Sequence, residues 1–365
     1  MALVALDQRV VREAAVPYLI LAACAAALAL LVTPLVAWVA QRVGALDEPA
    51  DRRVHAHAIP RLGGLAILAS GTATFALAPA LGVPVAALLR TAQWDLPWLL
   101  AGVAVITTAG VLDDVRGLRP LPKLAWQSAA ATLVVAGGYG VDGVDNPFTG
   151  TFAPLGMFGT VASVLWIVLV TNALNLIDGL DGLATGVALI ITLTLFGVSL
   201  VEQRLGAACL WAILGGGLAG FLRYNFSPAS IFLGDSGSML LGFLLAVLSL
   251  KSLEKSALAV VLTVPILALG FPIIEVALTL VRRTLTTGVG SVTRGDRQHI
   301  HDRLLERGVS QRRAVLILYA VCAAFGGLAF LALLIRGPAN AIIVGIGAVL
   351  MWIGIRAAGY GRSRQ

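Results

Sequence analysis

Long apolar runs, separated by short polar segments, occupy almost the whole chain. A helix that spans a bilayer needs about 20 apolar residues, and about eleven runs of that kind can be placed along the sequence. Their approximate ranges are 17–40, 62–82, 97–112, 121–140, 157–174, 183–201, 206–224, 237–253, 257–281, 314–336 and 339–357. The pattern predicts an all-α, polytopic integral membrane protein with about 11 transmembrane helices, in which residues 1–365 form a single domain.

The composition excludes a soluble fold of this length. Of the 365 residues, 59% are hydrophobic and 12% are charged, and the mean hydropathy is +0.93. Cys24, Cys209 and Cys322 all lie in apolar runs without the spacing of a disulfide or a metal site, so we expect them to be packing residues. Acidic and basic side chains are mixed in 1–16, which makes a poor signal peptide. We therefore expect 1–16 to be an external tail, followed by a retained membrane helix.

Lysine and arginine indicate the orientation, because they gather in cytoplasmic loops. With the N-terminus outside, most of the 26 basic residues fall inside, many of them in a large basic cytoplasmic loop, 282–313. Five carboxylates then lie at the cytoplasmic ends of spans, namely Asp113, Asp114, Asp178, Asp181 and Asp235. Asp142 and Asp145 are left outside in 141–156, which has the composition of an ordinary surface turn. We expect the functional site at the cytoplasmic face.

Carboxylates gathered at one membrane face among arginines indicate a site that handles a polyanion through a cation. Mg²⁺ fits best, because it prefers hard oxygen ligands and is often held by one or two carboxylates together with substrate phosphates. Mn²⁺ is the alternative ion. The adjacent Asp113 and Asp114 support this interpretation, since neighbouring carboxylates repel each other and are tolerated mainly beside a cation.

The most polar interruption between two apolar runs reads NALNLIDGLDGLATG, residues 172–186. Its amides and carboxylates, at a spacing of three, are Asn172, Asn175, Asp178 and Asp181. Helical backbone would place each of them beside the previous one, and the interleaved glycines let a ligand or another backbone come close. A polar turn between two membrane helices is the alternative. Unpaired aspartates at the edge of the hydrocarbon favour a functional site.

Two further segments place acidic residues at the mouth of a span. In VLDDVRGLRPLPK (111–123), two aspartates end one span and Lys123 enters the next, where it could meet a phosphate. In 225–242, Asp235 lies within GDSGS, whose small residues let backbone N–H groups and a metal-bound phosphate approach. A solvated helix cap is the alternative for the first segment, and a turn with a cap is the alternative for the second.

Two basic loops contain histidines. DRRVHAHAIPRLGG (51–64), taken alone, is a positive-inside loop attracted to lipid headgroups. The loop 282–313 has RGDRQHIHDRLLERG at its centre, with His299 and His301 two residues apart. This spacing does not put both histidines on one helix face, and no third ligand marks a zinc site. A phosphate or sugar contact suits this loop better.

Taken together, these segments resemble the polyprenyl-phosphate N-acetylhexosamine-1-phosphate transferases, over about residues 45–310 and in the same order. This family includes the bacterial UDP-GlcNAc:undecaprenyl-phosphate GlcNAc-1-phosphate transferases and, more distantly, phospho-MurNAc-pentapeptide translocase. The segment 52–64 looks like the early loop of the family, which has the form RKxHxxPxPxxGG. The other matching patterns are DDxxxLxxxxK at 113–123, NxxNxxDGxDGLA at 172–184, GDSGS at 234–238 and the histidine loop at 299–301.

The histidine loop departs from the family pattern at one position. The GlcNAc branch usually shows HIHH followed by Arg-Leu, whereas Asp302 here replaces the last histidine. His299, His301 and Arg303 still match, and the run of histidines typical of the translocase branch is absent. The expected span count also resembles the GlcNAc branch, which is therefore favoured.

The resemblance implies transfer of GlcNAc-1-phosphate, or another N-acetylhexosamine-1-phosphate, from its UDP-sugar to undecaprenyl or another polyprenyl phosphate. UMP would be released, and cell-envelope polysaccharide synthesis would begin, at the cytoplasmic face of a bacterial inner membrane. The implied roles are metal binding for Asp235 and Asn175; phosphate or sugar binding for Lys123, Asn172, His299, His301 and Arg303; and catalysis for Asp113, Asp114, Asp178 and Asp181. The partners are these two substrates and the bilayer, without nucleic acid, and a homodimer is left open.

Several alternatives are weighed against this interpretation. An aspartyl-phosphate intermediate is the rival to direct attack by the lipid phosphate, and phospho-MurNAc-pentapeptide transfer is the rival reaction. CDP-alcohol phosphotransferases share part of the 178–184 pattern but need a following arginine and a second acidic motif, and both are missing. A secondary transporter would place its charges near the bilayer midplane, and a non-enzymatic scaffold explains none of the motifs.

Overall fold

The computed structural model describes residues 8–47, 58–145, 151–253, 258–287 and 299–335, together with part of 342–349. Within these segments the chain is almost entirely helical, with two short antiparallel hairpins. The elements are α1 (Gln8–Val43), β1 (Leu46–Asp47), β2 (Ile59–Pro60), α2 (Gly63–Leu77), α3 (Val85–Thr91), α4 (Leu96–Arg116), α5 (Pro120–Ala136), β3 (Gly143–Asp145), β4 (Phe152–Pro154), α6 (Gly156–Ile177), α7 (Leu183–Val201), α8 (Leu205–Asn225), α9 (Gly234–Leu253), α10 (Leu258–Ala268), α11 (Gly270–Thr287), α12 (Ile300–Glu306) and α13 (Gln311–Leu334).

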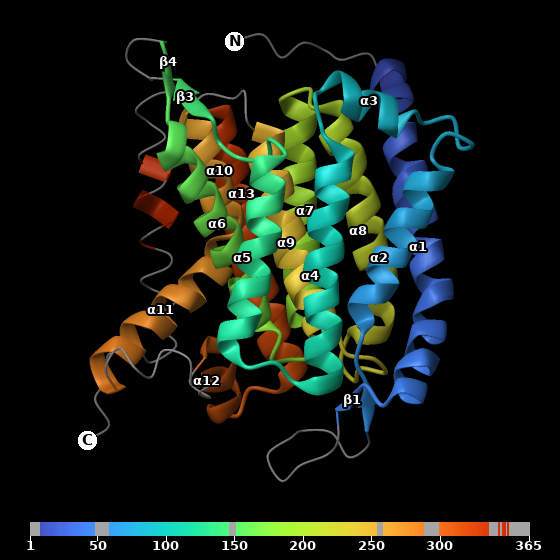
Figure 1. The fold of residues 1–365 in the computed structure, drawn as a ribbon, viewed down its shortest axis with the longest axis vertical. Helices are drawn as coiled ribbons and strands as arrows, with labels where there is room; N and C mark the ends of the chain where they lie inside the picture. Colours follow the sequence, from blue (N-terminus) through green and yellow to red (C-terminus); the bar gives the residue numbers. More distant parts are fainter. Residues whose placement is uncertain are drawn as a thin grey trace.

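The long helices run side by side, so that their ends form two opposite faces of the bundle (Figure 1). The β1–β2 hairpin, the turn between α4 and α5, and α12 lie at one end, at the bottom of Figure 1. The β3–β4 hairpin and α3 lie at the other end. The predicted site segments therefore gather at the end opposite the β3–β4 hairpin, as their assignment to one membrane face requires.

Seven of the described helices are long and apolar enough to cross a membrane. This finding confirms a polytopic helical membrane protein, although it does not establish the predicted count of eleven. The runs predicted at 62–82 and 121–140 form α2 and α5, which are shorter than that length. The run at 339–357 lies largely outside the described residues.

One predicted span was wrong, and two other segments contain more helix than expected. The first helix starts at Gln8, so part of the expected external tail is helical, while the apolar span within that helix, Ala15–Val43, agrees with the predicted start near residue 17. The expected single span 257–281 is two helices, α10 and α11, which are separated at Leu269 between prolines at 265 and 272. Proline lacks an N–H group and interrupts the helical hydrogen bonds. The loop 282–313 also contains helix at both ends and all of α12, while 288–298 lie outside the described residues.

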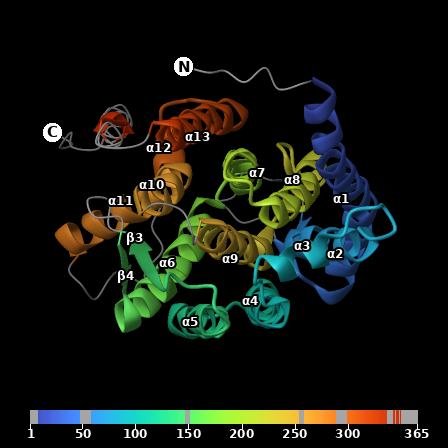
Figure 2. The same cartoon turned by 90° about the horizontal axis from the view of Figure 1, so that it is seen from above.

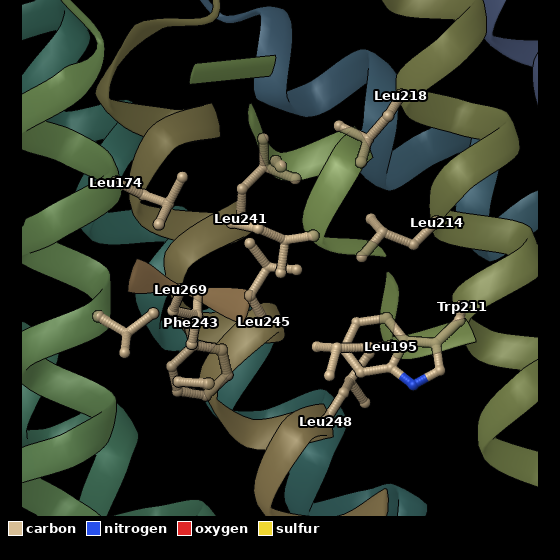
Figure 3. Packing of buried hydrophobic residues seen from close by; sticks show 14 of the residues in the cluster. Leu174, Leu195, Trp211, Leu214, Leu218, Leu241, Phe243, Leu245, Leu248 and Leu269 are labelled. Carbon is tan, nitrogen blue, oxygen red and sulfur yellow. The ribbon is translucent and has the colours of Figure 1, made fainter. Parts of the chain in front are cut away.

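Helix α9 occupies the middle of the bundle, surrounded by α2, α4, α6, α7 and α10 (Figure 2). Its buried Leu241, Phe243, Leu245 and Leu248 lie in the core cluster that also includes side chains of α6, α7 and α8 (Figure 3). Burial on all sides fits a helix that is apolar around its whole circumference. The first residues of this central helix carry the GDSGS motif.

Glycines bring the neighbouring helices into backbone contact at the start of α9. A Cβ atom on Gly64 of α2 would lie 2.3 Å from the Cα of Gly237, and one on Gly110 of α4 would lie 2.4 Å from the Cα of Ser236. Only glycine permits such close approach of two backbones. The N-terminus of α9 is thereby held between α2 and α4.

Candidate active site

Asp114, in the last turn of α4, caps the N-terminus of α9. Its Oδ1 accepts a hydrogen bond of 2.8 Å from the backbone N–H of Asp235, and its Oδ2 accepts one of 2.9 Å from the N–H of Ser236. Carboxylates are stabilised at helix N-termini, where N–H groups lack partners within the helix. Asp114, which is 7% exposed, therefore fixes the backbone that carries Asp235.

The Asp235 carboxylate is the centre of a charged network. The Lys123 ammonium donates to its Oδ1 and lies 2.6 Å from Oδ2 of Asp113. Asn175 Nδ2 donates to the same oxygen of Asp235 and, at 2.8 Å, to Ser238 Oγ. The structure thus brings together four residues that the sequence placed in three separate motifs.

Asn172 lies one helical turn before Asn175 and has a different environment. Its amide donates a 2.6 Å hydrogen bond to Gln127 Oε1 on α5, and a 2.8 Å bond to the carbonyl of Val168. These contacts tie α6 to α5. Asn172 does not line the cavity described next, so its predicted contact with substrate stays a prediction.

A cavity of about 570 Å³ opens beside this network. It is lined by the predicted residues Asp114, Asn175, Asp178, Asp181, Asp235, His299 and His301, and by residues that the motif analysis did not assign, including Asp47, Arg61, Asn225, Asp302 and Gln311. Helices α4, α6, α9 and α12 therefore contribute to one site. Lys123 contacts Asp235, and Asp113 contacts Lys123, but neither Asp113 nor Lys123 lines the cavity. Arg303 does not line it either.

The two aspartates after α6 differ in their contacts. Asp181 Oδ2 accepts a 3.1 Å hydrogen bond from the backbone N–H of Ala229, which holds the loop before α9. Among the described residues, the Asp178 side chain has no hydrogen-bond partner. Burial raises the pKa of the Asp178 carboxyl well above its usual range, and the charges of Asp235 and Asp114 raise it further. A cation bound beside Asp178 would favour its charged form.

Glu275 of α11 orients the histidine segment. Its side chain is fully buried, and Oε1 lies 2.9 Å from Nδ1 of His299. The backbone N–H of Ile300 donates to both carboxylate oxygens, at 3.1 and 3.3 Å. A carboxylate bound to one ring nitrogen fixes the orientation of an imidazole. No sequence motif marks Glu275, although a lone acidic residue inside an apolar run is a usable signal.

The rings of His299 and His301 are stacked, with centroids 5.4 Å apart. Burial lowers the pKa of His301 below the usual value for histidine. Its Nδ1 is buried, and it has no hydrogen-bond partner among the described residues. A neutral imidazole with an unsatisfied ring nitrogen in a polar cavity is suited to bind a polar group of a substrate.

Arg61 and Asp47 form an ion pair at the rim of the cavity, across the β1–β2 hairpin. The sequence marked Arg61 only as part of a basic loop, and nothing in the pattern pointed to Asp47. Arg52, Arg53 and His55 of the same loop lie outside the described residues.

The donor set fits a hard divalent cation. Among the described residues, no group of three or more histidine, cysteine or acidic side chains could hold a metal by itself. Mg²⁺ needs only one or two carboxylates when substrate phosphates complete its shell. Asp235 Oδ2 and the Asp178 carboxylate form no hydrogen bonds within the described segments, and both residues line the cavity with Asn175. These oxygens are the candidates to hold the ion.

Replacing Gly179 with alanine is expected to reduce activity without unfolding the protein. A Cβ atom at Gly179 would lie 2.4 Å from Nε2 of His301, so the ring must move. A displacement of about 1 Å in a positioned group can cost on the order of a hundredfold in rate. Steady-state kinetics would measure this loss. The matched control is Gly327→Ala, because its Cβ would have no neighbour within 4 Å. Equal activity of the two variants would contradict a role for His301.

Comparison with known proteins places the chain in a family. The sequence profile of glycosyl transferase family 4 matches residues 96–253. A probable undecaprenyl-phosphate N-acetylglucosaminyl 1-phosphate transferase of Bacillus subtilis (strain 168) is 36% identical over 292 residues, which cover 80% of this chain and 78% of that protein. The chain belongs to glycosyl transferase family 4. This membership confirms the resemblance inferred from the five motifs.

Other members of glycosyl transferase family 4 differ in how much of the chain they match. A decaprenyl-phosphate N-acetylglucosaminephosphotransferase of Mycobacterium leprae is 35% identical over 317 residues, covering 79% of this chain and 76% of that protein. A phospho-N-acetylmuramoyl-pentapeptide-transferase of Lactobacillus delbrueckii subsp. bulgaricus is 36% identical over 203 residues, which cover 52% of this chain and 61% of that protein. The similarity to the N-acetylglucosamine enzymes therefore extends over more of the chain.

Proposed function

We propose that this protein transfers GlcNAc-1-phosphate from UDP-GlcNAc to a polyprenyl phosphate such as undecaprenyl phosphate, releasing UMP. The observation that carries the proposal is the cavity in which Asp235, Asn175, Asp178 and His301 meet at one end of a membrane bundle. The relatives that match about four fifths of the chain are named for this transfer.

The chemistry requires two phosphate-bearing substrates to approach each other. An oxygen of the lipid phosphate forms a bond to the sugar-bearing phosphorus of the UDP-sugar. The bond from that phosphorus to the bridging oxygen breaks, and UMP leaves with the electron pair. Positioning and charge neutralisation provide most of the catalysis in such reactions. A bound Mg²⁺ would supply neutralisation of the diphosphate charge.

The residues of this chain divide into two groups around the cavity. Lys123, held by Asp113 and Asp235, is suited to bind the lipid phosphate. Its neighbours on α5, Leu121 and Leu124, are 70% and 43% exposed, and α5 lies at the rim of the bundle (Figure 2). A prenyl chain can therefore approach Lys123 from the lipid side. His301, with its unsatisfied Nδ1, would contact the nucleotide sugar from the opposite wall.

The deciding experiment is product analysis with purified protein in detergent. Labelled UDP-GlcNAc, undecaprenyl phosphate and Mg²⁺ should yield lipid-linked GlcNAc pyrophosphate and UMP in equal amounts. Asp142→Asn, at the far end of the bundle, is the control that should keep activity. Transfer only from UDP-MurNAc-pentapeptide would favour the translocase reaction instead. Uptake of label into vesicles without any product would indicate a transporter.

We also infer that the cavity faces the cytoplasm of a bacterial inner membrane. The supporting observation is that Arg42, Arg116 and Arg223 all end helices at the cavity end of the bundle, where positive residues are expected on the cytoplasmic side. Reporter fusions at Arg116, Asp178 and Arg303 should report the cytoplasm, and a fusion at Asp145 should report the outside. Reports from Asp178 and Asp145 on the same side would overturn this orientation.

A further inference from the structure

A second cavity lies at the end of the bundle opposite the candidate active site. Its volume is about 310 Å³. It is lined by Leu88, Thr91, Ala92, Trp94, Gln203, Arg204, Leu205, Gly206, Ala207, Lys251 and Ser252. These residues belong to the end of α3, the start of α8 and the last turn of α9. The proposed transferase reaction uses none of them.

The charge of this cavity is positive. Arg204 and Lys251 line it, and no acidic residue is among the lining residues. Lys251 Nζ donates a 2.9 Å hydrogen bond to the carbonyl of Gly138 and lies 5.7 Å from the ring centroid of Tyr139. The Nε of Arg204 is buried, and it has no hydrogen-bond partner among the described residues. The Arg204 side chain as a whole is half-buried. A buried Nε–H group without an acceptor is costly, so an anionic ligand at this guanidinium would stabilise the arrangement.

The start of α8 adds to the positive potential. Arg204 is the residue before α8, and the first three residues of the helix, Leu205, Gly206 and Ala207, all line the cavity. The first turn of a helix presents backbone N–H groups without intrahelical partners, and the helix dipole favours a negative charge there. Two side-chain cations and a helix N-terminus therefore converge on the same space. Phosphate groups suit such sites.

The surroundings of the cavity are apolar and exposed. Leu205 follows Arg204, and Leu200 and Val201 precede it beyond Glu202 and Gln203; the exposed fractions of Leu200, Val201 and Leu205 are 38%, 46% and 48%. In a membrane protein such side chains face the acyl chains of lipids. A ligand with a phosphate at one end and apolar chains at the other would fit both the basic cavity and this apolar rim.

We propose that this cavity binds the phosphate of an anionic phospholipid headgroup at the membrane surface opposite the active site. Arg204 binds the phosphate, Lys251 adds positive charge, and the acyl chains lie against the exposed leucines and valine. The same chemistry could take up free phosphate, which the test must separate from a lipid.

The test is native mass spectrometry of the full-length protein, released from neutral detergent after addition of phosphatidylglycerol, phosphatidylcholine or inorganic phosphate. We expect retention of phosphatidylglycerol in preference to phosphatidylcholine. An Arg204→Gln and Lys251→Met double variant should lose at least about tenfold in this affinity, because it removes both charged side chains that would contact the phosphate. Arg90→Gln, an exposed arginine on α3 outside the cavity, is the matched control and should retain binding.

The transferase assay shows whether the double variant is folded, because its substitutions lie far from the active site. If the double variant is inactive, the single variants Arg204→Gln and Arg204→Lys are tested in its place. Loss of phosphatidylglycerol binding in Arg204→Gln and retention of this binding in Arg204→Lys support the proposal. Unchanged phosphatidylglycerol binding by the active double variant would overturn the site. Binding of inorganic phosphate through Arg204, without any preference for phosphatidylglycerol, would overturn the assignment to a lipid.

Discussion

Asp235→Asn is expected to abolish transferase activity while leaving the fold intact. The substitution keeps the size of the side chain, but it removes the charge that pairs with Lys123 and that would help to hold a divalent cation. A loss of several kcal/mol in transition-state stabilisation corresponds to roughly a hundredfold to a thousandfold in rate, at about 1.4 kcal/mol per tenfold.

Steady-state turnover with added Mg²⁺ or Mn²⁺ measures this effect, and wild-type activity should disappear with a chelator. Asp142→Asn is the control, because it removes an exposed carboxylate at the other end of the bundle. A folded Asp235→Asn protein with nearly normal turnover would exclude the proposed role.

Asp113→Asn is expected to distinguish direct attack from a covalent intermediate. In the direct route, the Asp113 carboxylate helps to hold Lys123 and helps the lipid phosphate to lose its last proton. The second pKa of a phosphate ester is about 6, so much of the acceptor is already a dianion at neutral pH. The Asp113→Asn rate should therefore fall sharply at acidic pH and recover in part as the pH rises. The pH profile of turnover gives the answer.

The covalent route predicts the opposite result. An amide cannot accept a phosphoryl group, so no pH would restore activity. Wild-type enzyme without lipid acceptor would also release one UMP for each active site. These two findings together would show that the aspartyl-phosphate route is correct.

Asp114→Asn cannot make this distinction, although its position in the sequence is equivalent. Both oxygens of Asp114 accept N–H groups from the start of α9, and an amide can replace only one of them. The variant would leave a donor unsatisfied and shift Asp235, with a loss at every pH. Two adjacent aspartates thus have separable functions in the structure.

The sequence predicted the helical membrane fold and the gathering of the acidic motifs, because the length of an apolar run and the position of charges at its ends are local signals. It did not predict the break at Leu269, because residues 257–281 were interpreted as one apolar run despite the prolines at 265 and 272. The sequence did not predict the contact of Glu275 with His299 either. This contact joins α11 to the residue before α12, and the sequence between the two residues has no periodic pattern that would predict it. The ion pair between Arg61 and Asp47 depends on the pairing of β1 with β2. Strands of two residues are too short to give a sequence pattern that predicts this pairing.

The two walls of the active-site cavity differ in how they are held. On one side, the backbone of α9 touches glycines of α2 and α4 and is capped by Asp114, so it cannot shift without a collision. On the other side, the seven-residue α12 is fastened to α11 by the side chain of Glu275. Any closure around a substrate therefore requires α12, which carries His301, to move toward the fixed N-terminus of α9. Discrimination among sugars by induced fit would then depend on α12 rather than on the aspartates.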